Sequence, residues 1–217
     1  MIIEGTVGSL PNESVSDGDS KVILGKSKEL IVSELHGKYY TSAYNGRIFV
    51  GNQAAAGAVL PIYSGTTQQC GIFNPLGSGV NAVPIQLNIT YVDTTGAAGG
   101  LCLGYLKGCG GSIATGSAGI TVATTVTPIN LNLGGSGGSK ILFMSAAITC
   151  AAPSMLMQLG INQMVLTAAT TSLGQWEAQY KFDGYPIVYP GTAIFPAGNI
   201  ATLIKVACTI IWEESPV

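Results

Sequence analysis

The amino-acid sequence predicts an all-β protein, a jelly-roll-like β-sandwich with an extended N-terminal arm. Short apolar or alternating runs recur about every 10–15 residues and are separated by Gly, Asn and Pro, as strands and their turns are. Glycine supplies 30 of the 217 residues, about twice its usual share of ~7%. Helical character is confined to residues 54–58 and 156–171. Strands therefore build the predicted fold.

The arm is predicted from the charge distribution. Residues 1–47 hold 11 of the 20 charged residues, whereas residues 48–176 hold three, Asp93, Lys107 and Lys140. The segment SLPNESVSDGDS at 9–20 has the composition of an exposed, extended chain. We therefore expect an extended arm over residues 1–45 and a β-sandwich domain over residues 46–217.

The first half of the body contains three strand signals. Residues 83–93 (VPIQLNITYVD) alternate apolar with polar side chains and so predict a strand with one buried face. Residues 101–107 follow the turn-like TTGAAGG. Residues 120–133 alternate at their end, where Ile129, Leu131 and Leu133 stand between asparagines.

The second half contains five more strand signals, at residues 141–149, 155–166, 186–189, 193–195 and 200–213. The segment GGSGG at 134–138 lies between two strand-like runs and predicts a hairpin loop. About eight strands in a body of roughly 170 residues fit a jelly roll, in which two four-stranded sheets pack face to face.

Composition excludes two classes of partner. The formal net charge is −2, with nine cations against eleven anions, so no basic excess exists for nucleic-acid phosphates. The most apolar stretch, residues 141–157, is interrupted by Pro153 and is at the lower length limit for a spanning helix. The start, MIIEGTVGS, lacks the positive region of a secretory signal. We expect neither a nucleic-acid nor a membrane partner.

The five cysteines predict buried thiols. They are odd in number and scattered, and no two have C-x-x-C spacing. This pattern favours thiols in a chain made in a reducing compartment over a disulfide framework or a zinc site. We expect no metal and no cofactor. The cysteines are Cys70, Cys102, Cys109, Cys150 and Cys208.

Groups suited to catalysis are few, and we predict no enzyme. His36 is the single histidine, and nothing in the sequence fixes an orienting partner for it. The match to G-x-S-x-G at 134–138 has neither a later histidine nor a helical pattern after it. Glu213 and Glu214 are adjacent in a predicted strand, so their side chains face opposite ways.

Aromatic residues predict an interface at the junction of arm and body. Three tyrosines lie beside a histidine and an arginine in HGKYYTSAYNGR, and Tyr and Arg are frequent at interface hot spots. The predicted interface residues are His36, Tyr39, Tyr40, Tyr44 and Arg47. The competing interpretation is ordinary packing at the start of the sandwich.

A second aromatic cluster lies in QWEAQYKFDGYPIVYPG and consists of Trp176, Tyr180, Phe182, Tyr185 and Tyr189. Aromatic packing at a sheet edge is favoured over a carbohydrate-stacking surface.

Three segments resemble virion structural proteins of tailed bacteriophages. They are ELHGKYYTSAYNGRIFVGNQAAAGAVLPIYSG at 34–65, FNPLGSGVNAVPIQLNITYVDTTGAAGG at 73–100, and the ending YPIVYPGTAIFPAG with CTIIWEESPV. Within that group the chain resembles a capsid decoration (cement) protein. The resemblance implies a trimeric β-sandwich on the capsid surface of the virion, with the major capsid protein and copies of itself as partners. It also implies synthesis in the host cytoplasm and an arm that reaches over neighbouring subunits.

The nearly uncharged body, together with the polar arm, indicates a subunit of a dense assembly, because interface cores are depleted in charge and free surfaces usually carry ~25–35% charged residues. We therefore expect a non-enzymatic virion structural protein that binds the assembled capsid and stabilises it by bridging neighbouring capsid subunits. The alternatives are a tail or head-fibre component with a receptor- or glycan-binding sandwich, and a free binding module. A glycan hydrolase needs two facing carboxylates ~5–9.5 Å apart, and residues 48–176 supply only Asp93.

Overall fold

The computed structural model describes residues 37–53, 56–93, 99–108, 120–122, 125–135, 137–145, 148–162, 177–200 and 205–217. The chain divides into two compact units, Met1–Thr41 and Ser42–Val217. The division falls four residues before the predicted boundary at residue 45. All the described strands belong to the second unit, and most of the predicted arm lies outside the described residues.

The first sheet is antiparallel and has β15 (Lys205–Pro216) near its centre. β15 pairs with β5 (Val80–Asp93) on one side and with β1 (Ile48–Asn52) on the other. Burial along β15 alternates residue by residue, so a single face of the strand is covered. The spatial order is β13 (Glu177–Lys181), β5, β15, β1, β9 (Ile129–Asn130), and β2 (Ala58–Val59) also pairs with β15.

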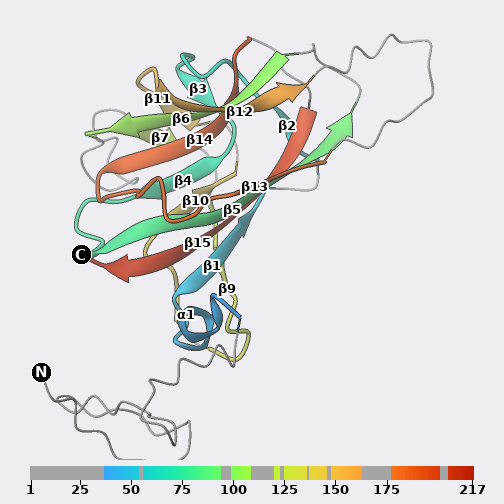
Figure 1. Cartoon of the computed structure of the whole chain (residues 1–217). Helices are drawn as coiled ribbons and strands as arrows, with labels where there is room; N and C mark the ends of the chain where they lie inside the picture. The colour runs from blue at the N-terminus through green and yellow to red at the C-terminus, as the bar shows by residue number, and fades with distance from the viewer. Residues whose placement is uncertain are drawn as a thin grey trace, which may run out of the picture. The chain divides into compact units, whose positions relative to one another are not determined.

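The second and third sheets lie on the other side of the main core. The second sheet has the order β12 (Ser154–Asn162), β6 (Gly99–Lys107), β14 (Thr192–Gly198), β4 (Gly71–Asn74), β10 (Leu142–Met144), β8 (Thr125–Val126). The third has the order β3 (Thr67–Gln68), β11 (Ile148–Cys150), β7 (Ile120–Val122). In Figure 1, β3 and β11 of the third sheet lie at the top of the view, and β5, β15 and β1 of the first sheet lie below them.

Two hydrophobic cores separate these layers. Trp212 and Ile210 of the first sheet share the larger core with Ile72 and Ile194 of the second sheet. The smaller core joins the far face of the second sheet to the third sheet and contains Phe73, Met144, Ile148, Ala193 and Phe195. Ile72 and Phe73 are neighbours in β4, and they enter different cores because successive side chains point to opposite faces. The chain is thus an all-β sandwich with a third layer.

The strand order has a regular pattern. Taken along the chain, β1, β4, β5, β6, β12, β13, β14 and β15 are eight strands divided equally between the first two sheets. Numbered one to eight, they are ordered 6-3-8-1 in the first sheet and 5-4-7-2 in the second. The short strands β7 to β11 are inserted between the fourth and the fifth.

Three predicted strands correspond directly to observed ones. The runs at 83–93, 101–107 and 193–195 became β5, β6 and β14, each longer than predicted. The run at 200–213 became β15, which ends at Pro216, and residues 201–204 of this run lie outside the described part of the chain. The run at 155–166 became β12, and its last four residues lie outside the described part of the chain.

Two predicted strands are wrong because they divide between sheets. The run at 120–133 forms β7, β8 and β9, which belong to three different sheets. Pro128 lies between β8 and β9 and has no N–H for a ladder. The run at 141–149 likewise splits into β10 of the second sheet and β11 of the third.

The predicted hairpin at 134–138 is also wrong. β9 pairs with β1, whereas β10 pairs with β4 and β8. The glycine-rich segment therefore connects two sheets. At 186–189 the structure has one isolated bridge, between Ala82 and Val188, in place of a strand.

A helix that the sequence did not predict is α1 (Tyr40–Tyr44). Residues 156–162, where helical character was noted, lie instead in β12. No helix in the described parts of the chain is long and apolar enough to cross a membrane.

Candidate interaction surface

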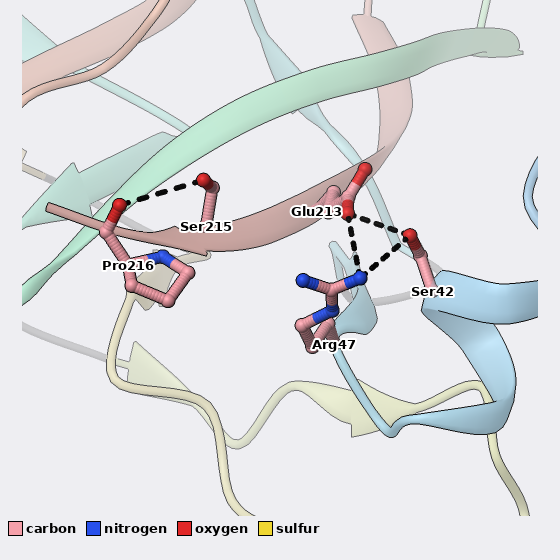
Figure 2. A network of polar contacts seen from close by, with 5 residues as sticks. All are labelled: Ser42, Arg47, Glu213, Ser215 and Pro216. Atoms are coloured by element: carbon pink, nitrogen blue, oxygen red, sulfur yellow. Dashed lines mark hydrogen bonds and ion pairs between the residues drawn. The ribbon is translucent and has the colours of Figure 1, made fainter. Parts of the chain in front are cut away.

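A polar network joins the first turn of the sandwich domain to the end of β15 (Figure 2). The Ser42 hydroxyl donates to Glu213 Oε1 at 2.7 Å, and Arg47 Nη2 lies 3.9 Å from the same oxygen. Arg47 Nη2 also donates to Ser42 Oγ at 3.4 Å. The side chains of Arg47 and Glu213 are 40% and 24% exposed, and ion pairs of that kind contribute about 0–1 kcal/mol. The network therefore mainly holds Ser42 and Arg47, on either side of the α1–β1 turn, against the end of β15.

Glu214 points to the other face of β15. Its Oε1 accepts a hydrogen bond from Ser139 Oγ at 2.5 Å and others from the amides of Lys140 and Ile141 at 3.1 and 3.3 Å. The residue is 6% exposed. Glu213 and Glu214 thus have separate partners on opposite faces, as the strand pattern predicted.

Asparagine side chains hold the segment after β9 against the α1–β1 turn. Asn130 Nδ2 donates to the Gly46 carbonyl at 2.9 Å, and Asn132 Nδ2 donates to the Tyr44 carbonyl at 2.8 Å. The Leu131 amide donates to the Ile48 carbonyl at 2.9 Å. Gly46 has a φ of 67°, which a residue with a side chain adopts at a cost. The asparagines therefore face inward at this point.

This arrangement reverses the orientation that alternation predicted for this segment. Leu133 is 84% exposed, and Ile129 and Leu131 are exposed as well. Apolar side chains that looked like the core face of a strand lie instead on the surface.

The predicted interface residues lie in different environments in the structure. Tyr40 and Tyr44 are the first and last residues of α1, with 47% and 70% of their surface exposed. Tyr39 is partly buried, and Lys38 Nζ lies 5.3 Å from the centre of its ring. Arg47 belongs to the polar network, and His36 lies outside the described residues. Ser42 and Glu213, which complete that network, carried no recognisable signal in the sequence.

The second aromatic cluster does not form one surface. Phe182 is in the main core. Tyr180 is half-buried, and burial raises the pKa of its hydroxyl. Tyr185 and Tyr189 are exposed, whereas Trp176 lies outside the described residues. The cluster thus combines core packing with two surface tyrosines.

Exposed large apolar side chains gather at one end of the sandwich, where β5 and β1 begin and β15 ends. We refer to this set as the apolar end. It consists of Tyr44, Leu76, Leu131, Leu133, Tyr185, Ile187, Tyr189 and Val217. Single exposed apolar residues are normal, whereas large contiguous apolar patches are typical of interaction sites.

A shallow cavity of about 150 Å³ adjoins the apolar end. Its apolar lining includes Leu156, Ile187 and Ile194, and Lys107 and Thr192 supply polar atoms. The cavity has the size and chemistry to hold one apolar side chain or one ring.

Four cysteines are buried and free, as the sequence predicted, and Cys109 lies outside the described residues. A hydrogen bond with the Cys208 thiol and burial raise the pKa of Cys70. Burial raises the pKa of Cys102 to about 11, and its Sγ donates to the Ala197 carbonyl at 3.4 Å. Protonated, enclosed thiols of this kind are poor nucleophiles. Within the described residues, no three His, Cys, Asp or Glu side chains group together as metal ligands would.

No family model matches this chain, and no curated protein or solved structure matches it. Function is therefore inferred from the residues themselves.

Proposed function

We propose that this chain is a non-enzymatic structural subunit of a virion, which binds the assembled capsid surface and stabilises it by bridging neighbouring capsid subunits. The observation that carries the proposal is the apolar end on a body with only three charged residues in positions 48–176. Burying such a surface against a partner costs little desolvation free energy, because few charged groups must be removed from water.

The strand order supports a jelly roll as the underlying fold. In the order 6-3-8-1 and 5-4-7-2, the first strand lies beside the eighth and the second beside the seventh. An antiparallel ribbon that folds over on itself produces these neighbours, and it yields two Greek-key sheets of four strands. The third sheet is an addition to this plan, formed by segments inserted before β4 and before β12.

The proposed mechanism is thermodynamic. A protein that binds the assembled shell and not its separated subunits stabilises the shell by mass action. Presentation as a homotrimer adds avidity, since three linked contacts dissociate together. The partners are the major capsid protein and further copies of this chain, at the surface of the virion.

Deletion of residues 1–20 tests the bridging role. We expect the deleted chain to keep its sandwich, because the compact unit begins at Ser42, and to bind particles stripped of the protein at least tenfold more weakly. A chain whose residues 1–20 are replaced by a Gly/Ser sequence of equal length is the matched control, since it keeps length but removes the side chains. Unchanged affinity of the deleted chain would rule out bridging by this segment.

A second candidate function is a receptor- or glycan-binding sandwich of a tail or head fibre. The exposed Tyr185 and Tyr189 favour it, because they flank in sequence the cavity-lining residues 186–188 and tyrosine rings stack on the apolar faces of sugars. The number of copies per virion separates the two candidates. A decoration protein is present in a copy number similar to that of the capsid subunits, whereas a fibre component is present in the few copies typical of a tail.

A further inference from the structure

We propose that Cys70 and Cys208 form a latent cross-linking site, where oxidation joins the first sheet to the second by a disulfide bond through the larger core. Both residues are free cysteines in this structure. The inference concerns the stability of the sandwich itself, so it does not rest on the proposed capsid role. The positions of the two residues, the contact between their thiols and the anchoring of their backbones carry it.

The two cysteines lie on facing sheets. Cys208 is on the buried face of β15 in the first sheet, and Cys70 directly precedes β4 of the second sheet. Both belong to the larger core, where Cys208 is 1% exposed and Cys70 is 0% exposed. Facing sheets lie about 10 Å apart, and the inter-sheet disulfide of immunoglobulin domains spans such a separation.

The sheets approach each other closely beside this pair. Gly51 of β1 is opposite Ile210 of β15. Phe143 of β10 is opposite Ile72 of β4. The Phe143 ring lies 2.2 Å from the position of a Cβ atom added to Gly51, so the two sheets leave no free space between these residues. Ile210 and Ile72 belong to the same core, and each is two residues along the chain from one of the two cysteines.

The two thiols are already in contact. The thiols of Cys70 and Cys208 form a hydrogen bond, which together with burial raises the pKa of Cys70. Cys102 Sγ donates instead to the Ala197 carbonyl at 3.4 Å, and Cys150 belongs to the smaller core. The contact therefore selects Cys70 and Cys208 as the pair that a disulfide joins with the least movement.

Hydrogen bonds hold the backbone on each side of the pair. The Gln53 amide donates to the Cys208 carbonyl at 2.9 Å, and the Cys208 amide donates to Gln53 Oε1 at 3.2 Å. Shortly before Cys70, the buried Gln68 donates from Nε2 to the Gly65 carbonyl at 3.0 Å. Two anchored backbones whose thiols already meet accept a disulfide without strain, whereas a strained disulfide is easily reduced.

The cross-linking step is a thiol–disulfide exchange with a small disulfide such as oxidised glutathione. The thiolate of one cysteine attacks the small disulfide, forms a mixed disulfide and releases one small thiol. The thiolate of the other cysteine then attacks the protein sulfur of the mixed disulfide and releases the second small thiol. The protein loses two protons and two electrons, and the small disulfide is reduced to two thiols.

Burial decides when this exchange takes place. Both cysteines are enclosed, so an oxidant reaches them only before the sandwich has closed or when it opens. The thiols therefore stay free in a reducing compartment, and a chain that folds or opens in an oxidising medium gains the cross-link. The same core then shields the disulfide from small reductants.

Refolding under oxidising conditions tests the pairing. The full chain is unfolded in urea and refolded with reduced and oxidised glutathione. Free thiols are then blocked with N-ethylmaleimide, and the chain is digested with trypsin without reduction. We expect fragment 206–217, which contains Cys208, to be joined to fragment 48–107, which contains Cys70 and Cys102. The joined fragments should persist in Cys102→Ala and disappear in Cys70→Ala. Cys102→Ala is the matched control, because Cys102 and Cys70 are both fully buried.

Melting of the oxidised and the reduced form of each variant measures the effect on the sandwich. The disulfide closes a loop from residue 70 to residue 208, and a cross-link over a long loop constrains the unfolded chain strongly. We expect oxidation to raise the Tm of the parent chain and of Cys102→Ala by at least about 5 °C and to leave the Tm of Cys70→Ala unchanged. Comparing two forms of one variant removes the effect of the substitution on packing.

A refolded parent chain in which Cys70 and Cys208 are both blocked by N-ethylmaleimide would overturn the inference. A link from fragment 206–217 that survives Cys70→Ala would also overturn it, since another cysteine would then be the partner. A link that forms without raising the Tm would refute the stabilisation of the sandwich by this disulfide. Binding of the chain to stripped particles tests the proposed capsid role separately, and that result does not depend on the cross-link.

Discussion

Glu213 and Glu214 are adjacent in β15, and their side chains have opposite environments. Glu213 is solvent-accessible and interacts with Ser42 and Arg47. Glu214 is buried and accepts hydrogen bonds from Ser139, Lys140 and Ile141. Solvent screens the first set of contacts, while the second satisfies donors that would otherwise be buried without a partner.

This difference gives a paired prediction. Glu214→Gln replaces an acceptor oxygen by an amide NH₂ group that faces donors, so we expect a loss of about 1–3 kcal/mol in the free energy of unfolding. Glu213→Gln is the control, and we expect it to cost about 1 kcal/mol or less. Urea denaturation at neutral pH measures both. Equal losses of unfolding free energy in the two variants would mean that the hydrogen bonds of the buried Glu214 stabilise the fold no more than the contacts of Glu213 do.

At the scale of elements, the second sheet explains why some strands lacked a readable pattern. β4, β10 and β14 contribute to both hydrophobic cores, so consecutive residues are apolar and alternation is lost. β15 is covered on one face and alternates throughout. Periodicity therefore located the long strands β5 and β15 of the first sheet, but it did not predict β1 and β13 and it merged the short inserted strands into runs that the structure divides.

Close contact between sheets gives a prediction at Gly51 of β1. A Cβ atom added there lies 2.2 Å from the Phe143 ring of β10, in the other sheet. We expect Gly51→Ala to lower the free energy of unfolding by about 1–3 kcal/mol, because the ring must move within a filled core.

Gly138→Ala is the control for this substitution, since nothing lies within 4 Å of its added Cβ. We expect its effect to stay within about 0.5 kcal/mol. Thermal melting detects the difference, as 1 kcal/mol shifts the Tm of a domain of this size by roughly 2–4 °C. Equal melting temperatures would mean that the two sheets are further apart at Gly51.

At the scale of the whole molecule, the low charge content leaves few groups that couple stability to pH. Cys102 is one of them, because burial raises its pKa from an ordinary value of 9.0 to about 11. The pKa is higher in the folded state, so the unfolded chain loses this proton first. The contribution of Cys102 to stability is complete below pH 9 and disappears as the pH rises toward 11.

We therefore expect the urea midpoint to fall between about pH 8 and about pH 10.5, and to fall less for Cys102→Ala than for the parent chain. Other groups titrate in both proteins alike, so the difference between the two slopes isolates Cys102. If the urea midpoints of the parent chain and of Cys102→Ala fall equally with pH, the Cys102 thiol does not contribute to the pH dependence of stability.

The candidate surface was partly predictable. Tyr44 and Arg47 were predicted as interface residues from composition alone, because aromatic residues and arginine are typical of interfaces. That role stays a prediction, and the structure places Tyr44 on the surface and Arg47 in the polar network with Ser42 and Glu213. Ser42 and Glu213 were not predicted, since 171 positions separate them. Leu131 and Leu133 were assigned to a strand face, and their exposure depends on hydrogen bonds from Asn130 and Asn132 to a distant turn.

The sequence by itself determined that the protein is built from strands, where β5, β6, β14 and β15 lie, and that charge is concentrated before residue 48. These properties depend on local periodicity and composition. Tertiary structure decided which strands share a sheet, that a third sheet covers the second, and that one end of the sandwich is apolar. Strand partners and exposed faces depend on contacts between residues far apart along the chain, and local periodicity contains no information about such contacts.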